Sequence, residues 1–183
     1  TSNGIGSTFN DSGLTNGTTY RYKIRAVDAA GNTSTNYSNI ATASTPDTAP
    51  PSNPTGLSAA PFSATRIDLT WLASSDNVAI ANYQIERCTS GGCTDFVQIG
   101  TSSSGTLFND SGLTNGTTYL YRVRAVDTAG NSSPGYSNIA TASTIDTQAP
   151  SNPSGLSAAP FSDTRIDLTW LASSDNVAIA NYQ

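Results

Sequence analysis

The sequence predicts an all-β protein, a seven-stranded β-sandwich that recurs in tandem along the chain. Apolar and polar residues alternate with period two from Tyr119 to Val126, as in a half-buried strand. Short strand-like segments are separated at regular intervals by Gly, Asn and Pro, which is typical of sandwiches. The sequence also repeats itself: Phe9, Asp47 and Trp71 recur as Phe108, Asp146 and Trp170, each 99 positions later.

The repeat predicts one complete copy at residues 54–144. Residues 1–45 are then the C-terminal part of a preceding copy, and residues 153–183 the N-terminal part of a following one. Residues 46–53 and 145–152 are Pro-rich linkers, expected to be short, extended and stiff because proline fixes φ.

The two partial copies could complete one another between chains. Both lack the segment equivalent to Ile85–Ile99, so a domain joined in this way would miss the centre of one sheet and keep open edges. We therefore favour successive copies within one longer repeat array.

Each strand of the complete copy has its own signal. The segment TRIDLTWL places Ile67, Leu69 and Trp71 on one face, and the alternation after Tyr119 places Tyr121, Val123 and Ala125 on another. Asn115-Gly116 is a strong turn dipeptide that precedes this second alternation. The seven strands are expected near 55–60, 65–72, 81–88, 95–100, 105–109, 117–127 and 136–144.

Several of these residues resemble a known family. The spacing of Leu113 and Tyr119, repeated in Leu14 and Tyr20, resembles the tyrosine corner of fibronectin type III domains. Trp71, Tyr83 and Leu57 match the inward residues of that immunoglobulin-like sandwich, and the linkers look like those of its bacterial extracellular branch. The resemblance implies that the Tyr hydroxyl bonds back to the preceding turn. The fold is a generic spacer and binding scaffold, so the resemblance alone assigns no function.

Composition excludes some function classes. The chain has 8 basic and 13 acidic residues, a net charge of −5 and no Lys/Arg cluster, so nucleic acid and anionic membranes are not expected partners. It has no 18-residue apolar run and thus no expected membrane span. It has no His, and Asp68, Asp167 and Glu86 are interpreted as solvated surface charges; we expect no enzyme activity from this segment.

Cys88 and Cys93 flank a short turn, Thr89 to Gly92, that is expected to connect two strands. A tight hairpin brings the Cα atoms within the roughly 7 Å that a disulfide requires. Free or metal-bound thiols are the alternative, but zinc prefers four ligands and the chain has no His. A disulfide would place the protein in an oxidising, extracellular or cell-surface setting.

One group of oxygen ligands is predicted to meet at the domain junction. Asp47 lies in the linker, Asp76 and Asn77 in the loop after 65–72, and Asp127 at the end of 117–127. Carboxylate and amide oxygens are the ligands that Ca²⁺ prefers, so a calcium site is one hypothesis and no other cofactor is expected. The alternative is that Asp and Asn make Asx-turns. The set recurs at the next junction as Asp146, Asp175 and Asn176.

Two classes of function remain. The first is a structural or adhesive segment of a long extracellular bacterial fibre, stalk or surface adhesin, with neighbouring repeats, laterally associated chains or cell-surface polysaccharide as partners. The alternative is a spacer or carbohydrate-binding accessory module of a secreted polysaccharide-degrading enzyme. Near-identity of neighbouring copies favours the first. Burial of Phe62, Phe161, Tyr37 and Tyr136 would leave no aromatic binding platform.

Overall fold

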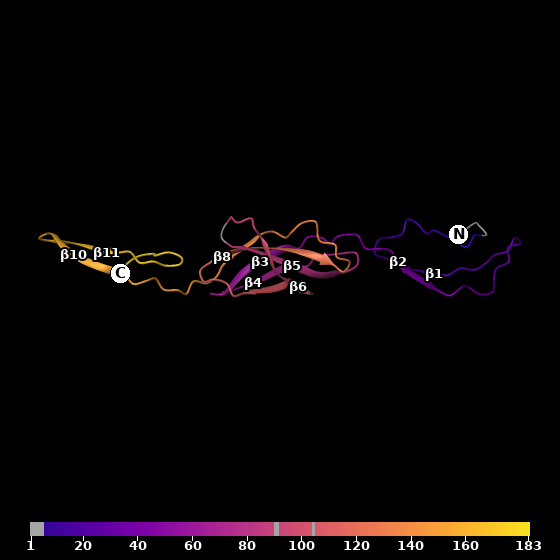
Figure 1. Cartoon of the computed structure of the whole chain (residues 1–183), viewed down its shortest axis with the longest axis horizontal. Coiled ribbons are helices and arrows are strands. Elements are labelled where there is room, and N and C mark those ends of the chain that lie inside the picture. The colour runs from indigo at the N-terminus through magenta and orange to yellow at the C-terminus, as the bar shows by residue number, and fades with distance from the viewer. Residues whose placement is uncertain (1–5, 90–91, 104) are drawn as a thin grey trace.

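The computed structural model describes residues 6–89, 92–103 and 105–183, and within them all regular structure is strand (Figure 1). The strands pair antiparallel throughout. The all-β expectation is confirmed. In chain order the strands are β1 Thr19–Tyr22, β2 Ala41–Ser44, β3 Thr55–Ser63, β4 Arg66–Leu72, β5 Ile80–Thr89, β6 Val97–Ser102, β7 Leu107–Ser111, β8 Thr118–Asp127, β9 Ala140–Ser143, β10 Ser154–Ser162 and β11 Arg165–Leu171.

Seven strands, β3 to β9, form the central sandwich. One sheet has the order β3-β4-β7 and the other β6-β5-β8-β9. The longest pairing joins β5 to β8, from Ile80 opposite Asp127 to Thr89 opposite Tyr119. Each of the seven segments expected from the sequence overlaps one of these strands, so the sandwich prediction is confirmed.

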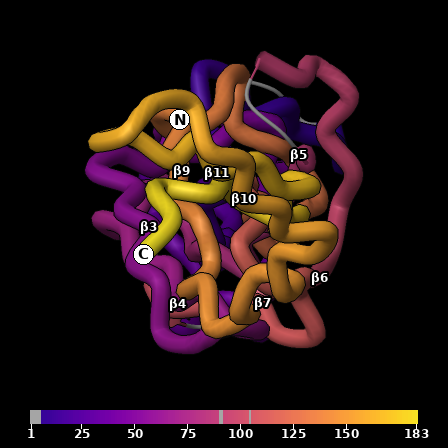
Figure 2. The backbone as a smooth tube through the Cα atoms, turned by 90° about the vertical axis from the view of Figure 1, so that its left-hand side faces the viewer, coloured from indigo at the N-terminus to yellow at the C-terminus, as the bar shows by residue number. Residues whose placement is uncertain are grey.

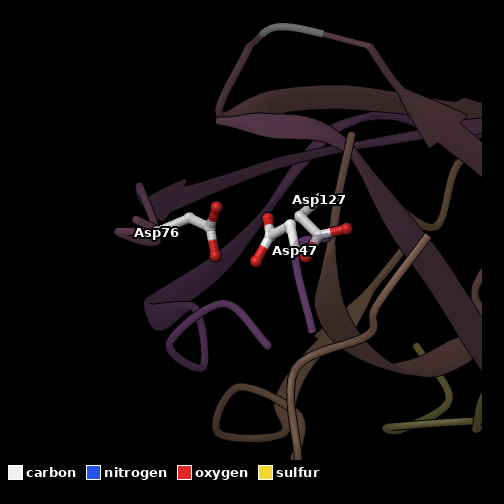
Figure 3. Close-up of side chains that lie close together, drawn as sticks. All are labelled: Asp47, Asp76 and Asp127. Atoms are coloured by element: carbon white, nitrogen blue, oxygen red, sulfur yellow. The ribbon is translucent and has the colours of Figure 1, made fainter. Parts of the chain in front are cut away.

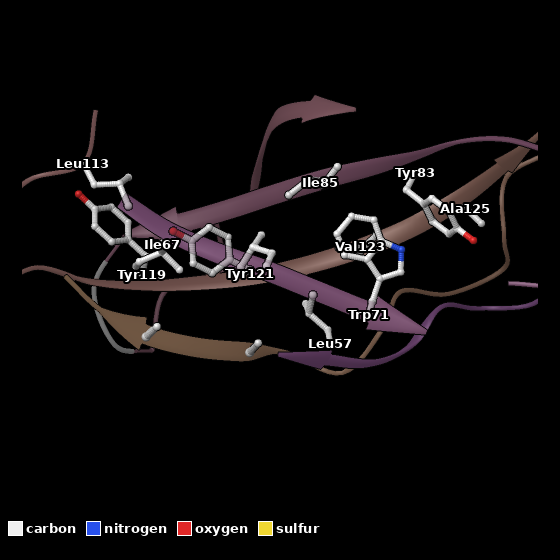
Figure 4. Packing of buried hydrophobic residues seen from close by; sticks show 13 residues of the cluster. Leu57, Ile67, Trp71, Tyr83, Ile85, Leu113, Tyr119, Tyr121, Val123 and Ala125 are labelled. Atoms are coloured by element: carbon white, nitrogen blue, oxygen red, sulfur yellow. The ribbon is translucent and has the colours of Figure 1, made fainter. Parts of the chain in front are cut away.

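The core lies between the two sheets (Figure 4). Ile67 and Leu69 of β4 are fully buried, as are Val123 and Ala125 of β8, which follows from the period-two alternation of both strands. Trp71 packs edge-on against Tyr83 of the facing sheet, with ring centroids 5.4 Å apart.

The tyrosine corner forms as the sequence predicts. The Tyr119 hydroxyl accepts a hydrogen bond from the Thr114 backbone N–H at 3.0 Å. The equivalent Tyr20 hydroxyl accepts one from the Thr15 N–H at 2.8 Å. These bonds fix the turn that precedes each strand.

The last strand is shorter than expected. It begins at Ala140 rather than at residue 136. In the segment before Ala140, serine hydroxyls accept the hydrogen bonds that backbone carbonyls accept in a regular β-ladder. The Val123 N–H donates to Ser137 Oγ at 3.1 Å, and the Ala125 N–H donates to Ser133 Oγ at 3.2 Å. Because these bonds satisfy the edge of β8, the segment stays paired without regular strand geometry.

The prediction of solvated charge is wrong for Glu86, which is buried on the outer face of β5. Its carboxylate binds the Arg122 guanidinium at 2.6 Å and accepts a hydrogen bond from the Tyr136 hydroxyl at 2.9 Å. Asp110, also buried, pairs with Arg87 at 3.0 Å. The first pair joins the neighbouring strands β5 and β8, whereas the second joins β5 to β7 of the other sheet, and the sequence alone indicates neither pairing.

The aromatic residues expected to be buried are partly exposed. Phe62 is 61% exposed, Phe161 66% and Tyr37 48%, whereas Tyr136 is half-buried. The Arg66 guanidinium lies 4.1 Å from the Phe62 ring centroid, and Arg122 lies 3.8 Å from that of Tyr136. Arginine guanidinium groups therefore lie over these rings, which stay outside the core.

The remaining strands form two separate pairs, β1–β2 and β10–β11, on opposite sides of the central sandwich (Figure 1). The chain is elongated as a result. Seen from the end that holds β10 and β11, its three parts overlap within one compact outline (Figure 2). In the part of the chain that the structure describes, no helix is long and apolar enough to cross a bilayer.

Candidate functional site

Asp47, Asp76 and Asp127 meet at the end of the central sandwich that receives the linker. One carboxylate oxygen from each lies within 4.8 Å of the others. Figure 3 shows the Asp76 carboxylate directed toward Asp47, with Asp127 beyond it. The linker, the β4–β5 loop and the end of β8 thus bring together residues up to 80 positions apart (47 to 127).

Asp127 is the most buried of the three, at 2% exposed. Its Oδ1 accepts hydrogen bonds from the backbone N–H groups of Ala129 and Asn131, both at 2.8 Å. Its Oδ2 accepts one from Asn131 Nδ2 at 2.8 Å. Burial raises the pKa of this carboxyl, but the bonds from Asn131 and Ala129 outweigh burial, and the net pKa is lowered. The group is therefore charged at neutral pH.

Asp76 and Asp47 each use one oxygen in a local turn. Asp76 Oδ2 accepts from the Val78 N–H at 2.9 Å and the Ala79 N–H at 3.1 Å. Asp47 Oδ1 accepts from the Ala49 N–H at 3.1 Å. The Asx-turn interpretation is thus correct for one oxygen of each. The second oxygens, Asp76 Oδ1 and Asp47 Oδ2, are buried and have no hydrogen-bond donor within the described residues.

Asn77 contributes a donor to this cluster. Its Nδ2 donates to Asp47 Oδ1 at 3.1 Å and to Asn16 Oδ1 of the preceding part of the chain at 3.3 Å. Asn16 is a junction residue that the sequence analysis did not identify. The sequence places Asn16 in the turn before β1 but does not indicate which residues that turn contacts.

The second junction repeats part of the arrangement. Asp146 Oδ1 accepts from the Gln148 N–H at 3.0 Å and from Asn176 Nδ2 at 3.3 Å. Asp175 Oδ2 accepts from the Val177 N–H at 3.0 Å, and its Oδ1 is buried without a donor in the described part of the chain. The counterpart of Asp127, 99 positions on, lies outside the given sequence, and the described residues of this junction include the other two carboxylates.

Cys88, near the end of β5, is joined to Cys93 in a disulfide, with Cα atoms 6.2 Å apart. The pairing agrees with the spacing of the two residues. Residues 90 and 91 of the expected turn lie outside the described residues.

Comparison with known proteins identifies the sandwich. The family model described as "Fibronectin type III domain" matches residues 52–142. The central sandwich is a fibronectin type III domain. A solved structure of titin domains A168–A170 has the same fold, with a TM-score of 0.51 at 24% identity, covering 59% of this chain and 37% of that one.

Curated relatives of this fibronectin type III chain carry enzyme names. Exoglucanase B of Cellulomonas fimi is 40% identical over 92% of this chain and 16% of its own length. Chitinase A1 of Niallia circulans is 37% identical over 74% of this chain and 19% of its own length. The chain therefore spans less than a fifth of each of these relatives.

Proposed function

We propose that the chain is a non-catalytic spacer segment of an extracellular bacterial enzyme that degrades polysaccharide. The match to exoglucanase B carries this proposal, because nearly the whole chain corresponds to a small part of a much larger protein. The disulfide between Cys88 and Cys93 agrees with an extracellular setting.

The side-chain chemistry supports a mechanical role. Glu86 and Asp110 are held in ion pairs with arginines, and Asp127 is held in its own turn. Such groups stabilise a sandwich and position no reacting atom. A compact domain between two Pro-rich linkers would hold other domains of the enzyme apart.

The comparisons favour this alternative over the fibre or adhesin hypothesis, whose support is the near-identity of successive copies. The proposal keeps the domain boundaries drawn from the sequence: parts of copies at 1–45 and 153–183, linkers at 46–53 and 145–152, and a complete domain at 54–144. The proposal requires neighbouring repeats of the same polypeptide as partners of this domain.

The test begins with the purified chain incubated with insoluble cellulose and chitin. A spacer stays in the supernatant and releases no reducing sugar. In the full-length protein, deletion of residues 54–144 should lower activity on insoluble polysaccharide and leave activity on a soluble oligosaccharide unchanged. A full-length protein without a catalytic domain would refute the proposal. Sedimentation of the chain with either polymer would instead make it a carbohydrate-binding accessory module.

We also propose that Ca²⁺ binds between Asp47, Asp76 and Asp127. Two buried carboxylate oxygens without donors, next to a third carboxylate, support this proposal. Like charges this close repel in a partly desolvated site, and a buried acceptor left unpaired is costly. A hard divalent cation with oxygen ligands would relieve both.

Thermal unfolding with Ca²⁺ and with a chelator tests the site. We expect Ca²⁺ to raise the melting temperature of the parent chain. Asp76→Asn, which keeps an acceptor for the Val78 and Ala79 N–H groups, should abolish the increase. The matched control Asp175→Asn, at the junction with two carboxylates, should retain it. Equal melting temperatures of the parent in both conditions would leave turn bonding as the whole role of these residues.

A further inference from the structure

We propose that the Asn-Gly turn of each copy is a docking surface for one loop of the copy that follows, the loop that corresponds to β4–β5 of the central sandwich. This contact fixes the orientation of successive copies. The partner it fits is another copy of this same module. The inference goes beyond the spacer role and is independent of any attached enzyme.

The first junction has a direct contact between copies. Asn16 Nδ2 donates to Thr48 Oγ1 of the linker at 2.7 Å, and Asn77 Nδ2 donates to Asn16 Oδ1 at 3.3 Å. The Gly17 N–H donates to the Pro46 carbonyl at 3.2 Å. One turn therefore holds both the linker and the loop of the next copy.

The second junction reproduces the contact. Asn115 Nδ2 donates to Thr147 Oγ1 at 2.7 Å, and Asn176 Nδ2 donates to Asn115 Oδ1 at 3.2 Å. These residues are the counterparts, 99 positions on, of those at the first junction. The two asparagine side-chain bonds thus form at both junctions of the described chain.

Close packing adds shape specificity to these bonds. A Cβ at Gly17 would lie 2.6 Å from Val78 Cγ2, and a Cβ at Gly116 would lie 2.7 Å from Val177 Cγ2. Real Cβ atoms do not approach other carbons this closely, so a side chain at either glycine would force the facing valine side chain, or the copy that carries it, to shift. Each glycine also has a positive φ, +63° at Gly17, which any other residue adopts at a cost.

The chain offers a matched control for that backbone cost. Gly13 also has a positive φ, +75°, but a Cβ there would meet nothing within 4 Å. Gly13→Ala and Gly17→Ala therefore share the backbone strain and differ in the contact with Val78. Asn77→Ala is an independent variant, since it removes the bond to Asn16 from an exposed loop and leaves both glycines unchanged.

Electron–electron distance measurements on the whole chain would test the inference. Nitroxides are attached through an introduced ketone-bearing amino acid at Thr42 and Thr141, which are exposed, equivalent positions on β2 and β9, so that the disulfide stays intact. The samples contain a chelator, which separates this contact from any bound calcium.

We expect one narrow distance distribution for the labelled parent chain and for Gly13→Ala. Gly17→Ala and Asn77→Ala should each give a distribution at least about twofold broader, because a linker released from the turn samples many orientations. The inference is overturned if both variants match the parent, or if the parent is already as broad as they are. Equal broadening by Gly13→Ala and Gly17→Ala, with none by Asn77→Ala, would also overturn it.

Discussion

The hairpins β3–β4 and β10–β11 have nearly the same sequence and opposite environments. Thr55–Gln84 and Ser154–Gln183 differ at two positions. Their strands pair in the same register, yet Ile67 is fully buried and its counterpart Ile166 is 66% exposed. The second sheet covers the first hairpin, whereas no strand among the described residues lies over the other.

Local structure is the same in both hairpins. The Ser74 N–H donates to the Tyr83 hydroxyl and the Ser173 N–H to the Tyr182 hydroxyl, each at 2.8 Å. The open face of β10–β11 is an apolar hollow, lined by Pro153, Leu156, Leu168, Trp170, Tyr182 and Gln183. The hairpin sequence therefore determines pairing and turns, whereas burial requires strands distant in sequence.

Trp71→Ala should have the largest effect. Trp71 is 4% exposed against Tyr83, so its truncation should lower the free energy of unfolding by roughly 3–5 kcal/mol. The matched variant Trp170→Ala, in the uncovered hairpin, should change it by less than about 0.5 kcal/mol. Urea unfolding followed by circular dichroism measures both. Similar losses of unfolding free energy from the two variants would mean that both hairpins pack against an equivalent core.

Loss of the disulfide should be next in size. Replacing Cys88 and Cys93 together with serine should destabilise the central sandwich by about 2 kcal/mol, the chain-entropy value for so short a loop. Urea midpoints measure the loss, and mass spectrometry without reductant should find the parent thiols joined. Two readily alkylated thiols in the native protein would contradict the bridge.

The tyrosine corners allow a smaller paired test. Tyr119→Phe removes the acceptor of the Thr114 N–H next to the core and should cost about 1 kcal/mol. Tyr20→Phe removes the same bond at an exposed corner and should cost less. Chemical denaturation of the two variants compares them directly, and a larger loss from Tyr20→Phe would contradict the role assigned to burial.

The smallest effect is expected from pH at Asp127. Its pKa is lowered in the folded state, so its contribution to stability is present above the ordinary aspartate pKa of about 3.9 and is lost as pH falls through the folded-state pKa. In chelator, the difference in unfolding free energy between the parent and Asp127→Asn should shrink between about pH 6 and pH 2. A difference that is constant across this range would contradict the assignment.

Much of the fold followed from the sequence because its signals are periodic and local. The alternation in β8 placed Tyr121 and Val123 in the core, and the Leu113–Tyr119 spacing indicated the corner. Burial of Glu86 was missed because it depends on register, which sets Glu86 opposite Arg122. The expected topology predicted that the three aspartates lie close together. It did not predict that two of their carboxylate oxygens lack hydrogen-bond donors among the described residues, because this depends on loop geometry that the spacing of residues in the sequence does not encode.

Native-state hydrogen exchange on the whole chain tests most directly the claim that the second sheet, and not the hairpin sequence, stabilises the central sandwich. The amides of Leu69 and Leu168 have the same sequence neighbours and lie in equivalent strands. We predict exchange at least about a hundredfold slower at Leu69, since core strands open only with near-global unfolding. Comparable rates at the two amides would contradict the claim.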